Sequence, residues 1–334
     1  MISRTELMEA LEIVKPGLAS KEHIEQSTSF AFLGGKVITY NDEISVSHPV
    51  KGIDFDGAIR AEEFYKILNK LKQDDIEVLK EANEIILKAG RVKAGLLLQN
   101  EIRMPLDALG DIGKWHEVDA DIVDRIQFTA FACSTDMSRP ILTCVHVRND
   151  GLIEASDGYR LIRYNTGVSL PVNTFLIPAT IITKLSKCVP THIAEGQGWI
   201  HFKTEAGTIY SCRTFFGDAY PKTDHLTEVD GEEFLFPKTI NDVLDKAIIF
   251  TGTDVLAEVT VTLTMNKLIV KGQSDTGWIE ETVNARYKGG DKIFAISPYL
   301  LRDVGVELKQ CVLGEDKIKF EGENWVYIGM LKVR

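Results

Sequence analysis

Residues that could bind phosphate or a metal ion occur at several places in the chain, but none of them completes a known site. Gly34–Lys36 (GGK) has the glycines and lysine of a phosphate loop, yet it lacks the upstream glycine and the Ser or Thr after the lysine that would hold magnesium. Asp54–Gly57 (DFDG) begins like a calcium loop, but the remaining ligands and the terminal glutamate do not follow. The seven histidines show no pairing at metal-ligand spacing.

We therefore predict no catalytic residues, no metal and no cofactor. The nucleophile motif GxSxG and the zinc motif HExxH are both missing from the sequence. Catalytic residues can converge from distant segments, so an unrelated three-domain enzyme stays open as an alternative. A deep pocket with clustered ionisable groups of shifted pKa would favour that alternative.

Leu152–Leu161 (LIEASDGYRL) carries a different signal. Asp157-Gly158 is a turn pair, because the glycine permits a positive φ and the aspartate can hydrogen-bond its own backbone. Apolar residues on both sides predict a hairpin or strand-end turn, and taken alone this is a β-turn with a surface tyrosine and arginine. Three further segments give it a functional context: Ser138–Val147 (SRPILTCVHV), expected as a preceding paired strand, Arg213–Leu226 (RTFFGDAYPKTDHL) and Trp325–Arg334 (WVYIGMLKVR).

The elements that must position these segments come from a threefold repeat. In each copy an apolar run leads through a small or capping residue into a helix: Ala58–Leu71, Phe175–Cys188 and Phe294–Glu307. The copies recur at intervals of roughly 117 and 119 residues, far longer than a solenoid repeat of about 20–50 residues. An opening helix and strands precede each copy. The sequence therefore predicts an α+β fold of three similar helix-plus-sheet domains, at 1–117, 118–228 and 229–334.

Composition narrows the class of protein. The chain has 334 residues, of which 44% are hydrophobic and 26% charged, as in ordinary soluble proteins. The five cysteines are scattered without a CxxC, which favours free thiols in a reducing cytoplasm. No apolar run reaches the roughly 18–20 residues of a membrane span. The net charge of −11 argues against a protein that holds nucleic acid by bulk electrostatics, but not against one that surrounds it.

The repeated helices each have one apolar face and one mixed face. The mixed faces carry Lys66 and Lys70 in the first copy, Lys184 and Lys187 in the second, and Arg302 in the third. From charge alone these are ordinary solvated helix faces. The repetition favours a second interpretation, in which equivalent helices face one axis and contact the phosphates of a polyanion without reading its sequence.

Four stretches in the expected order resemble the bacterial DNA polymerase III β subunit, the sliding clamp. Arg139–Leu142 (RPIL) is similar to the family's R-x-x-L strand, Ala155–Leu161 (ASDGYRL) to its A-T-D-G-H-R-L turn, and Gly217–Thr223 (GDAYPKT) to its G-x-[FY]-P-D-Y turn. Asn284–Leu301 resembles the family's Y-x-G and I-x-F-N-x-x-Y-L segments. The resemblance covers all three predicted domains and is weakest in the first.

The resemblance implies a head-to-tail homodimer whose six domains form a ring, with helices lining the hole and sheets outside. Duplex DNA would pass through the ring without sequence specificity, and no membrane would be involved. Lys21 and Arg139 match positions of the family that touch DNA or lie near the channel. Glu62 and Thr180 stand where clamps commonly carry an arginine and a lysine, which weakens the expected DNA track. Ile249 and Phe250 match dimer-interface positions, although third-domain core is an equal alternative.

The resemblance also implies an apolar groove between the second and third domains that takes short peptides from DNA polymerases, the clamp loader and other proteins with a clamp-binding motif. By motif the groove residues are Leu142, Ser156, Gly158, Tyr159, Arg160, Leu161, Pro221, His225, Leu226, Ile328, Met330 and Leu331. The register of the last strand is open, because Gly329–Val333 aligns with the family's terminal M-P-M-R-L in two ways. Tyr159 in place of histidine, and His225 in place of arginine, imply an altered peptide preference.

We therefore expect a non-catalytic processivity factor for DNA replication. Its short length and degenerate motifs favour a phage, prophage or other mobile-element version. The alternative is a clamp-fold adaptor that binds replication-protein peptides without sliding on DNA.

Overall fold

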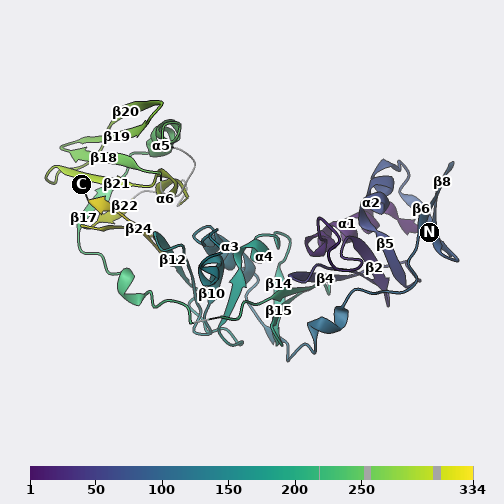
Figure 1. Ribbon diagram of the computed structural model, residues 1–334. Coiled ribbons are helices and arrows are strands. Elements are labelled where there is room, and N and C mark those ends of the chain that lie inside the picture. The colour runs from purple at the N-terminus through teal and green to yellow at the C-terminus, as the bar shows by residue number, and fades with distance from the viewer. Residues whose placement is uncertain (218, 252–256, 304–309, 334) are drawn as a thin grey trace. The chain divides into compact units, whose positions relative to one another are not determined.

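A computed structural model describes residues 1–217, 219–251, 257–303 and 310–333 (Figure 1). The chain divides into two compact units: unit 1 comprises residues 1–127 and 170–216, and unit 2 comprises residues 128–169 and 217–334. Each unit is built mainly from antiparallel sheet with short helices, which confirms the predicted α+β class. Two predicted stretches, Asp218 and Val304–Glu307, lie outside the described residues.

The largest sheet of unit 1 joins strands from the first and second predicted domains. Its order is β5-β2-β3-β4-β16-β15-β14-β9, and β4 pairs with β16 through Ser45 opposite Ser211. The strands are β2 (Ser29–Leu33), β3 (Lys36–Tyr40), β4 (Ile44–Pro49), β5 (Gly57–Arg60), β9 (His116–Glu117), β14 (Pro190–Gly196), β15 (Trp199–Thr204) and β16 (Ile209–Arg213). A 3-10 turn, η2 (Leu106–Leu109), packs near this sheet, where Trp199 Nε1 donates to the carbonyl of Ala108 at 3.0 Å.

A second sheet of unit 1 has the order β1-β6-β7-β8, formed by β1 (Ile2–Ser3), β6 (Asp75–Glu81), β7 (Glu84–Ala89) and β8 (Val92–Leu97). Helix α1 (Arg4–Val14) begins at the N-cap Ser3, whose hydroxyl accepts from the amide of Glu6, and 3-10 turn η1 (Lys15–Gly17) follows it. Leu7, Leu11 and Val14 recur at helical spacing and are buried, as the sequence predicts. On α2 (Ala61–Lys70), Phe64 is buried in the same way.

The helix predicted over the second copy of the repeat is shorter than expected. Strand β13 (Phe175–Pro178) leads into α4, which covers only Ala179–Ile182. Thr180–Thr183 is a run of β-branched residues with low helix propensity, and the Thr183 hydroxyl donates to the carbonyl of Ala179 at 2.7 Å. The chain continues in turns with i to i+3 hydrogen bonds. Lys184 and Lys187 therefore lie after the helix, not on it, which corrects the prediction.

Unit 2 has its own large sheet, in which strands of the second and third predicted domains follow one another in the order β10-β11-β12-β24-β23-β22-β17. These strands are β10 (Cys144–Val147), β11 (Leu152–Ser156), β12 (Arg160–Asn165), β17 (Glu232–Leu235), β22 (Gln310–Leu313), β23 (Lys317–Glu321) and β24 (Trp325–Met330). The predicted hairpin at Asp157-Gly158 joins β11 to β12 and is confirmed. The expected strand Ser138–Val147 is wrong in its first half, because Pro140–Thr143 forms 3-10 turn η3; Pro140 fixes φ and has no N–H for a ladder.

The last sheet has the order β20-β19-β18-β21-β25, from β18 (Val259–Thr264), β19 (Lys267–Ser274), β20 (Gly277–Asn284), β21 (Lys292–Ile296) and β25 (Lys332–Val333). Helix α5 (Ile240–Ile248) packs on it, and α6 (Pro298–Asp303) follows β21 as the third copy of the repeat predicts. A Cβ at Gly272 would lie 2.6 Å from the Ala247 carbonyl oxygen, so glycine permits this close helix–sheet approach.

The remaining helices are α3 (Ile122–Ala130), which opens the second repeat, and η4 (Asp224–Leu226). The division into three domains at 1–117, 118–228 and 229–334 stays a prediction, because each compact unit joins one terminal predicted domain to part of the middle one. Every helix in the described ranges is too short or too polar to cross a membrane.

Candidate functional site

The β11–β12 turn in unit 2 is held by its own side chains. The Asp157 carboxylate accepts hydrogen bonds from the amides of Tyr159 at 2.9 Å and Arg160 at 3.0 Å, and from Arg160 Nε at 2.9 Å. Asp157 and Arg160 are almost fully buried, so this ion pair is shielded from solvent. Gly158 has φ +93°, a conformation that side chains with a Cβ rarely adopt. The turn therefore presents Tyr159 on a rigid base.

Strand β24 fixes the position of the C-terminal groove residues. Leu161 pairs with Ile328, and the Met330 amide donates to the carbonyl of Tyr159 at 2.8 Å. Ile328 is buried within the sheet, whereas Met330, at the end of β24, is 36% exposed beside the turn. Pairing with β12 thus gives this strand one register in the structure.

Tyr159 and Met330 line a small hollow of about 40 Å³ whose floor includes Ile296 and Leu300. Ser297 also lines it, and its buried Oγ has no hydrogen-bond partner within the described residues. Lys332 forms an ion pair with Glu258, and both residues line the same hollow. The hollow can take one aliphatic side chain of a ligand and offers one polar group to it.

The predicted groove residues separate into two layers. Gly158, Tyr159, Pro221, His225 and Met330 are exposed, and Ser156 and Leu226 are partly exposed. Leu142, Arg160, Leu161, Ile328 and Leu331 are buried, so in this structure they support the surface from beneath and do not present side chains to a ligand. The prediction missed Ile296, Ser297 and Leu300. The sequence pattern could have indicated these three residues, because they belong to the third copy of the repeat.

Two predicted DNA-facing residues, Lys21 and Lys66, line a hollow of about 480 Å³ in unit 1, together with Lys15 and Arg60. Lys66 forms an ion pair with Glu62, four residues earlier on α2. Arg60 Nη1 lies 3.0 Å from a carboxylate oxygen of Glu22. Carboxylates thus neutralise part of the positive charge in this hollow.

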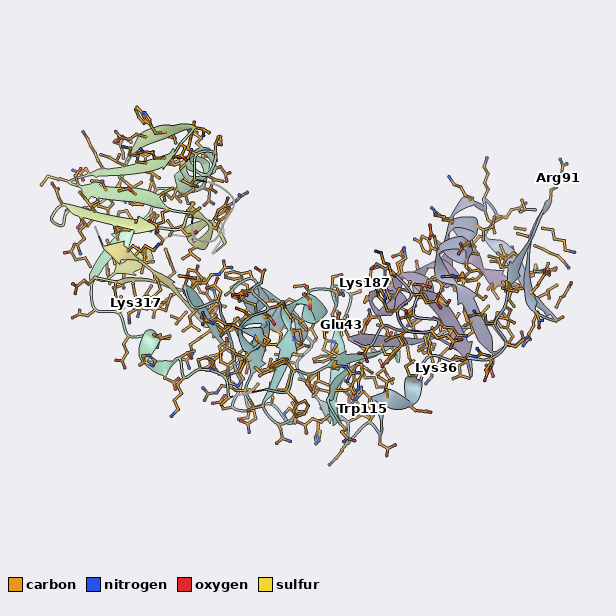
Figure 2. The ribbon with its side chains drawn as sticks, in the orientation of Figure 1. Lys36, Glu43, Arg91, Trp115, Lys187 and Lys317 are labelled. Atoms are coloured by element: carbon orange, nitrogen blue, oxygen red, sulfur yellow. The ribbon has the colours of Figure 1, made fainter. Side chains whose placement is uncertain are left out.

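A second hollow of about 430 Å³, also in unit 1, is lined by Lys184, Lys187, Lys15 and Glu12. Figure 2 labels Lys187 and Glu43, and Glu43 pairs with Lys184 at 3.6 Å. Burial would raise the pKa of Glu12, but hydrogen bonds from Lys15 and Tyr65 and the charges of Lys15 and Lys187 lower it. Lys15, which the prediction missed, therefore belongs to the same cluster of charges.

The other predicted cations are dispersed. Lys70 is exposed at the end of α2. In unit 2, Arg302 Nε lies 3.4 Å from Asp245, and the Arg139 guanidinium lies beside Gly158. Arg139 is thus placed at the hairpin turn of the candidate groove.

The predicted interface residues differ in exposure. Ile249 is 72% exposed just after α5, which rules out core packing for its side chain in this structure, whereas Phe250 packs beside Gly277 at the start of β20. Strands β8 and β20 are outer strands of their sheets, and both expose apolar side chains: Leu97 is 70% and Trp278 64% exposed. Figure 2 shows Arg91 at the tip of the turn before β8. Exposed apolar edges of this kind are typical of surfaces that pair with another chain.

The part of the chain that the structure describes holds no cluster of three or more His, Cys, Asp or Glu side chains suited to a metal ion. All five cysteines are buried, and burial raises the pKa of Cys144 to about 11.

Comparison with solved structures gives full-length matches. The chain is similar to a sliding clamp (DNA polymerase III subunit beta) from Pseudomonas aeruginosa bound to griselimycin, with a TM-score of 0.85 and 17% identity over 100% of this chain and 98% of that one. It is similar to the β subunit from DNA polymerase of Streptococcus pyogenes, with a TM-score of 0.85 and 19% identity over 100% and 99%. For the DNA polymerase sliding clamp from Bacillus subtilis the TM-score is 0.84 and the identity 20%, over 100% and 98%.

No protein-family model matches the sequence, and no curated protein matches it. The fold agrees with the predicted resemblance to the bacterial sliding clamp. Along its whole length, the chain has the fold of the bacterial sliding clamps, the β subunits of DNA polymerase III.

Proposed function

We propose that the chain is a sliding clamp that encircles duplex DNA and tethers a replicative DNA polymerase for processive synthesis. The observation that carries this proposal is the match to sliding clamps over 98–100% of both chains, at TM-scores of 0.81–0.85. A ring holds DNA by topology, so the role needs no catalytic step, cofactor or metal. It also needs little affinity at each contact, which suits a chain of net charge −11.

Two copies associate head to tail in this proposal, so that six domains close the ring. The exposed Ile249 and the apolar edges of β8 and β20 support such an association. The proposal also places Phe250 in the dimer interface and divides each chain into three domains, at 1–117, 118–228 and 229–334. The DNA-facing residues are Lys21, Lys66, Lys70, Arg139, Lys184, Lys187 and Arg302, to which Lys15 is added. These cations contact phosphates without reading bases.

The proposed peptide site is the groove around Tyr159 and Met330. Polymerases, the clamp loader and other proteins with a clamp-binding motif insert an apolar side chain into the small hollow there. The related Pseudomonas aeruginosa clamp has been solved bound to griselimycin, which makes that compound a suitable probe. The proposed partners act in the cytoplasm, on the DNA of a bacterium or of a phage or other mobile element.

The second candidate is a clamp-fold adaptor that binds the same peptides but does not slide on DNA. One observation favours it: Lys66, Lys184 and Arg302, three of the proposed DNA-facing residues, each pair with a carboxylate. Surface pairs of this kind are weak, so DNA phosphates can replace them. The two candidates therefore predict different retention on DNA, which an experiment can measure.

The deciding experiment measures retention on circular and linearised primed DNA by gel filtration, with solution mass from light scattering. A sliding clamp, loaded by its cognate loader, is a dimer that stays on circular DNA and is lost from linear DNA. Equal retention on both forms, or a monomer at micromolar concentration, would contradict the clamp. A chain that binds griselimycin but shows no topology-dependent retention would be the adaptor.

A further inference from the structure

Apart from the 3-10 turn η4, residues 219–227 form an irregular segment, which carries three of the proposed groove residues, Pro221, His225 and Leu226. Its backbone hydrogen bonds, within the described residues, are local: Leu226 N–H to the Thr223 carbonyl, and Thr227 N–H to the Asp224 carbonyl. No sheet ladder formed by the described residues holds the segment. Its position therefore depends on side chains.

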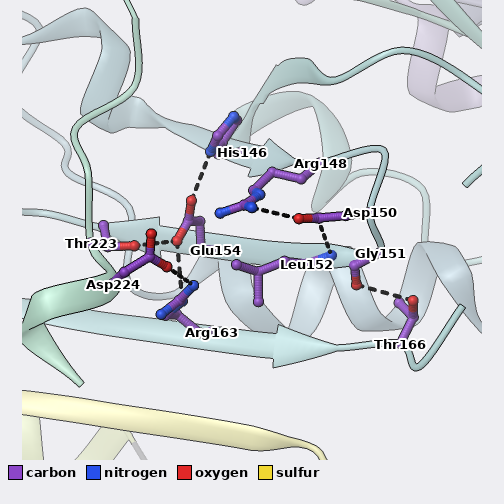
Figure 3. A network of polar contacts seen from close by, with 10 residues as sticks. All are labelled: His146, Arg148, Asp150, Gly151, Leu152, Glu154, Arg163, Thr166, Thr223 and Asp224. Carbon is purple, nitrogen blue, oxygen red and sulfur yellow. Dashed lines mark hydrogen bonds and ion pairs between the residues drawn. The ribbon is translucent and has the colours of Figure 1, made fainter. Parts of the chain in front are cut away.

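The side-chain contacts converge on one buried carboxylate, that of Glu154 in β11, which is 2% exposed (Figure 3). One of its oxygens lies 2.8 Å from His146 Nδ1 of β10. The other accepts a hydrogen bond from the Thr223 hydroxyl and lies 3.3 Å from Arg163 Nε of β12. Two of these partners, His146 and Arg163, belong to strands of the sheet, whereas Thr223 comes from the irregular segment.

Two further contacts reinforce the same attachment. Arg163 Nη2 donates to the Asp224 carboxylate at 2.6 Å, so the arginine joins Glu154 to the residue after Thr223. The Tyr220 ring stacks on the His146 ring, with centroids 4.6 Å apart and planes 25° apart. Tyr220, Thr223 and Asp224 thus contact Glu154 or one of its immediate partners.

Thr223 is buried although the residues on both sides of it are exposed. The exposed fraction of Thr223 is 4%, and its exposed neighbours are Lys222 and Asp224. A buried carboxylate is costly unless hydrogen bonds and counter-charges satisfy it. Docking of Thr223 supplies one of those hydrogen bonds, so the segment and the carboxylate stabilise each other.

We infer that Glu154 is a positioning residue: by holding Thr223 and Asp224 it fixes segment 219–227 against the sheet and so sets the wall of the groove that Pro221, His225 and Leu226 form. The groove itself rests on the proposed function, whereas the attachment of the segment does not.

The attachment is tested by limited trypsin digestion of the full chain, with cleavage after the exposed Lys222 followed by mass spectrometry. Glu154→Gln and Thr223→Val each remove part of the attachment, and we expect cleavage at Lys222 to rise about tenfold while the main thermal transition is retained. Thr223→Ser keeps the hydroxyl and should restore slow cleavage. Asp150→Asn is the matched control, because it breaks a nearby ion pair with Arg148 that does not include the segment.

The effect on the groove is tested with labelled griselimycin as the probe, by fluorescence anisotropy. Glu154→Gln and Thr223→Val should weaken its binding about tenfold, and Thr223→Ser and Asp150→Asn should leave it as in the parent chain. Unchanged cleavage at Lys222 in both weakening variants would overturn the attachment. Faster cleavage with unchanged griselimycin affinity would overturn the role in the groove.

A parent chain that does not bind griselimycin, but whose variants are cleaved faster at Lys222, would remove the groove from the proposed function and leave the attachment by Glu154 supported. A failure of the proposed groove and a failure of the attachment by Glu154 therefore give different results.

Discussion

The Met330 amide donates a hydrogen bond to the carbonyl of Tyr159, with nitrogen and oxygen 2.8 Å apart. One residue belongs to the β11–β12 turn and the other to the last long strand, and this bond continues the pairing of β12 with β24. It brings two exposed apolar side chains to one hollow although they are far apart in sequence. The candidate peptide site therefore depends on a single strand pairing in unit 2.

Met330→Ala should weaken griselimycin binding about tenfold, because truncating an apolar residue at the centre of a binding hollow commonly costs more than 1 kcal/mol. Fluorescence anisotropy measures the change. Met265→Ala is the control, since Met265 is 70% exposed on the β18–β19 turn and does not line the hollow. Equal affinity of the Met330 variant and the parent would show that the hollow is not the binding site.

Gly158→Ala should show whether the turn contributes to griselimycin binding, apart from the effect of backbone strain on stability. Gly158 has φ +93° and a new Cβ would lie 3.3 Å from the Arg139 guanidinium, whereas Gly167 has φ +76° with open space around it. Each alanine variant should lose about 1–2 kcal/mol of unfolding free energy in urea, since both carry backbone strain. Only Gly158→Ala should also weaken griselimycin, because it alters the turn that presents Tyr159. A loss of binding in both variants would argue against a specific role for the turn.

His201 should make the chain sensitive to acid. Its side chain is fully buried in unit 1 with Nδ1 2.8 Å from the Ser211 hydroxyl, and burial lowers its pKa to about 4. The unfolded histidine has a pKa of about 6.5, so this contribution to stability is present above that pH and is lost as the pH falls from about 6.5 towards 4.

At pH 5 the loss should be about 2 kcal/mol, measured by urea unfolding across the pH range. His201→Gln should remove this part of the pH dependence, whatever its effect on stability at neutral pH. His225, which is exposed, provides the control variant His225→Gln. If the unfolding free energy of His201→Gln kept the same pH dependence as the parent chain, His201 would not be the cause of the acid sensitivity.

Ile249→Glu should shift the solution mass from dimer to monomer. The side chain is 72% exposed, so a glutamate there costs the folded chain little, but it would bury an unpaired charge in the proposed interface. Light scattering over a concentration series reads the change, and Met265→Glu at a similarly exposed position should remain a dimer. A dimeric Ile249→Glu chain would place the interface elsewhere.

The local elements followed from the sequence because their causes are local. Leu7, Leu11 and Val14 recur at helical spacing, and the three repeat copies do begin as strand followed by helix. The turn at Asp157-Gly158 was predictable from the backbone freedom of glycine and the aspartate side chain. Four motifs in order were enough to predict the clamp fold, which the solved structures bear out.

Other features depend on which distant residues become neighbours. Nothing local in Lys184 tells whether a carboxylate will neutralise it, because its partner, Glu43, comes from a distant part of the sequence. The short helix α4 coincides with the run of β-branched residues Thr180–Thr183, whose low helix propensity the apolar spacing of this copy did not show.

The sequence by itself determined the three copies, their strand-into-helix order and the turn that carries Tyr159, because periodicity and glycine act within a few residues. Only the tertiary structure decided that Met330 meets Tyr159, that Ser297 lines their hollow, and that Glu154 is the buried partner of Thr223. Those relationships arise from strand pairing and burial between residues far apart in the chain, and the energies that select them exist only when the sheets have formed.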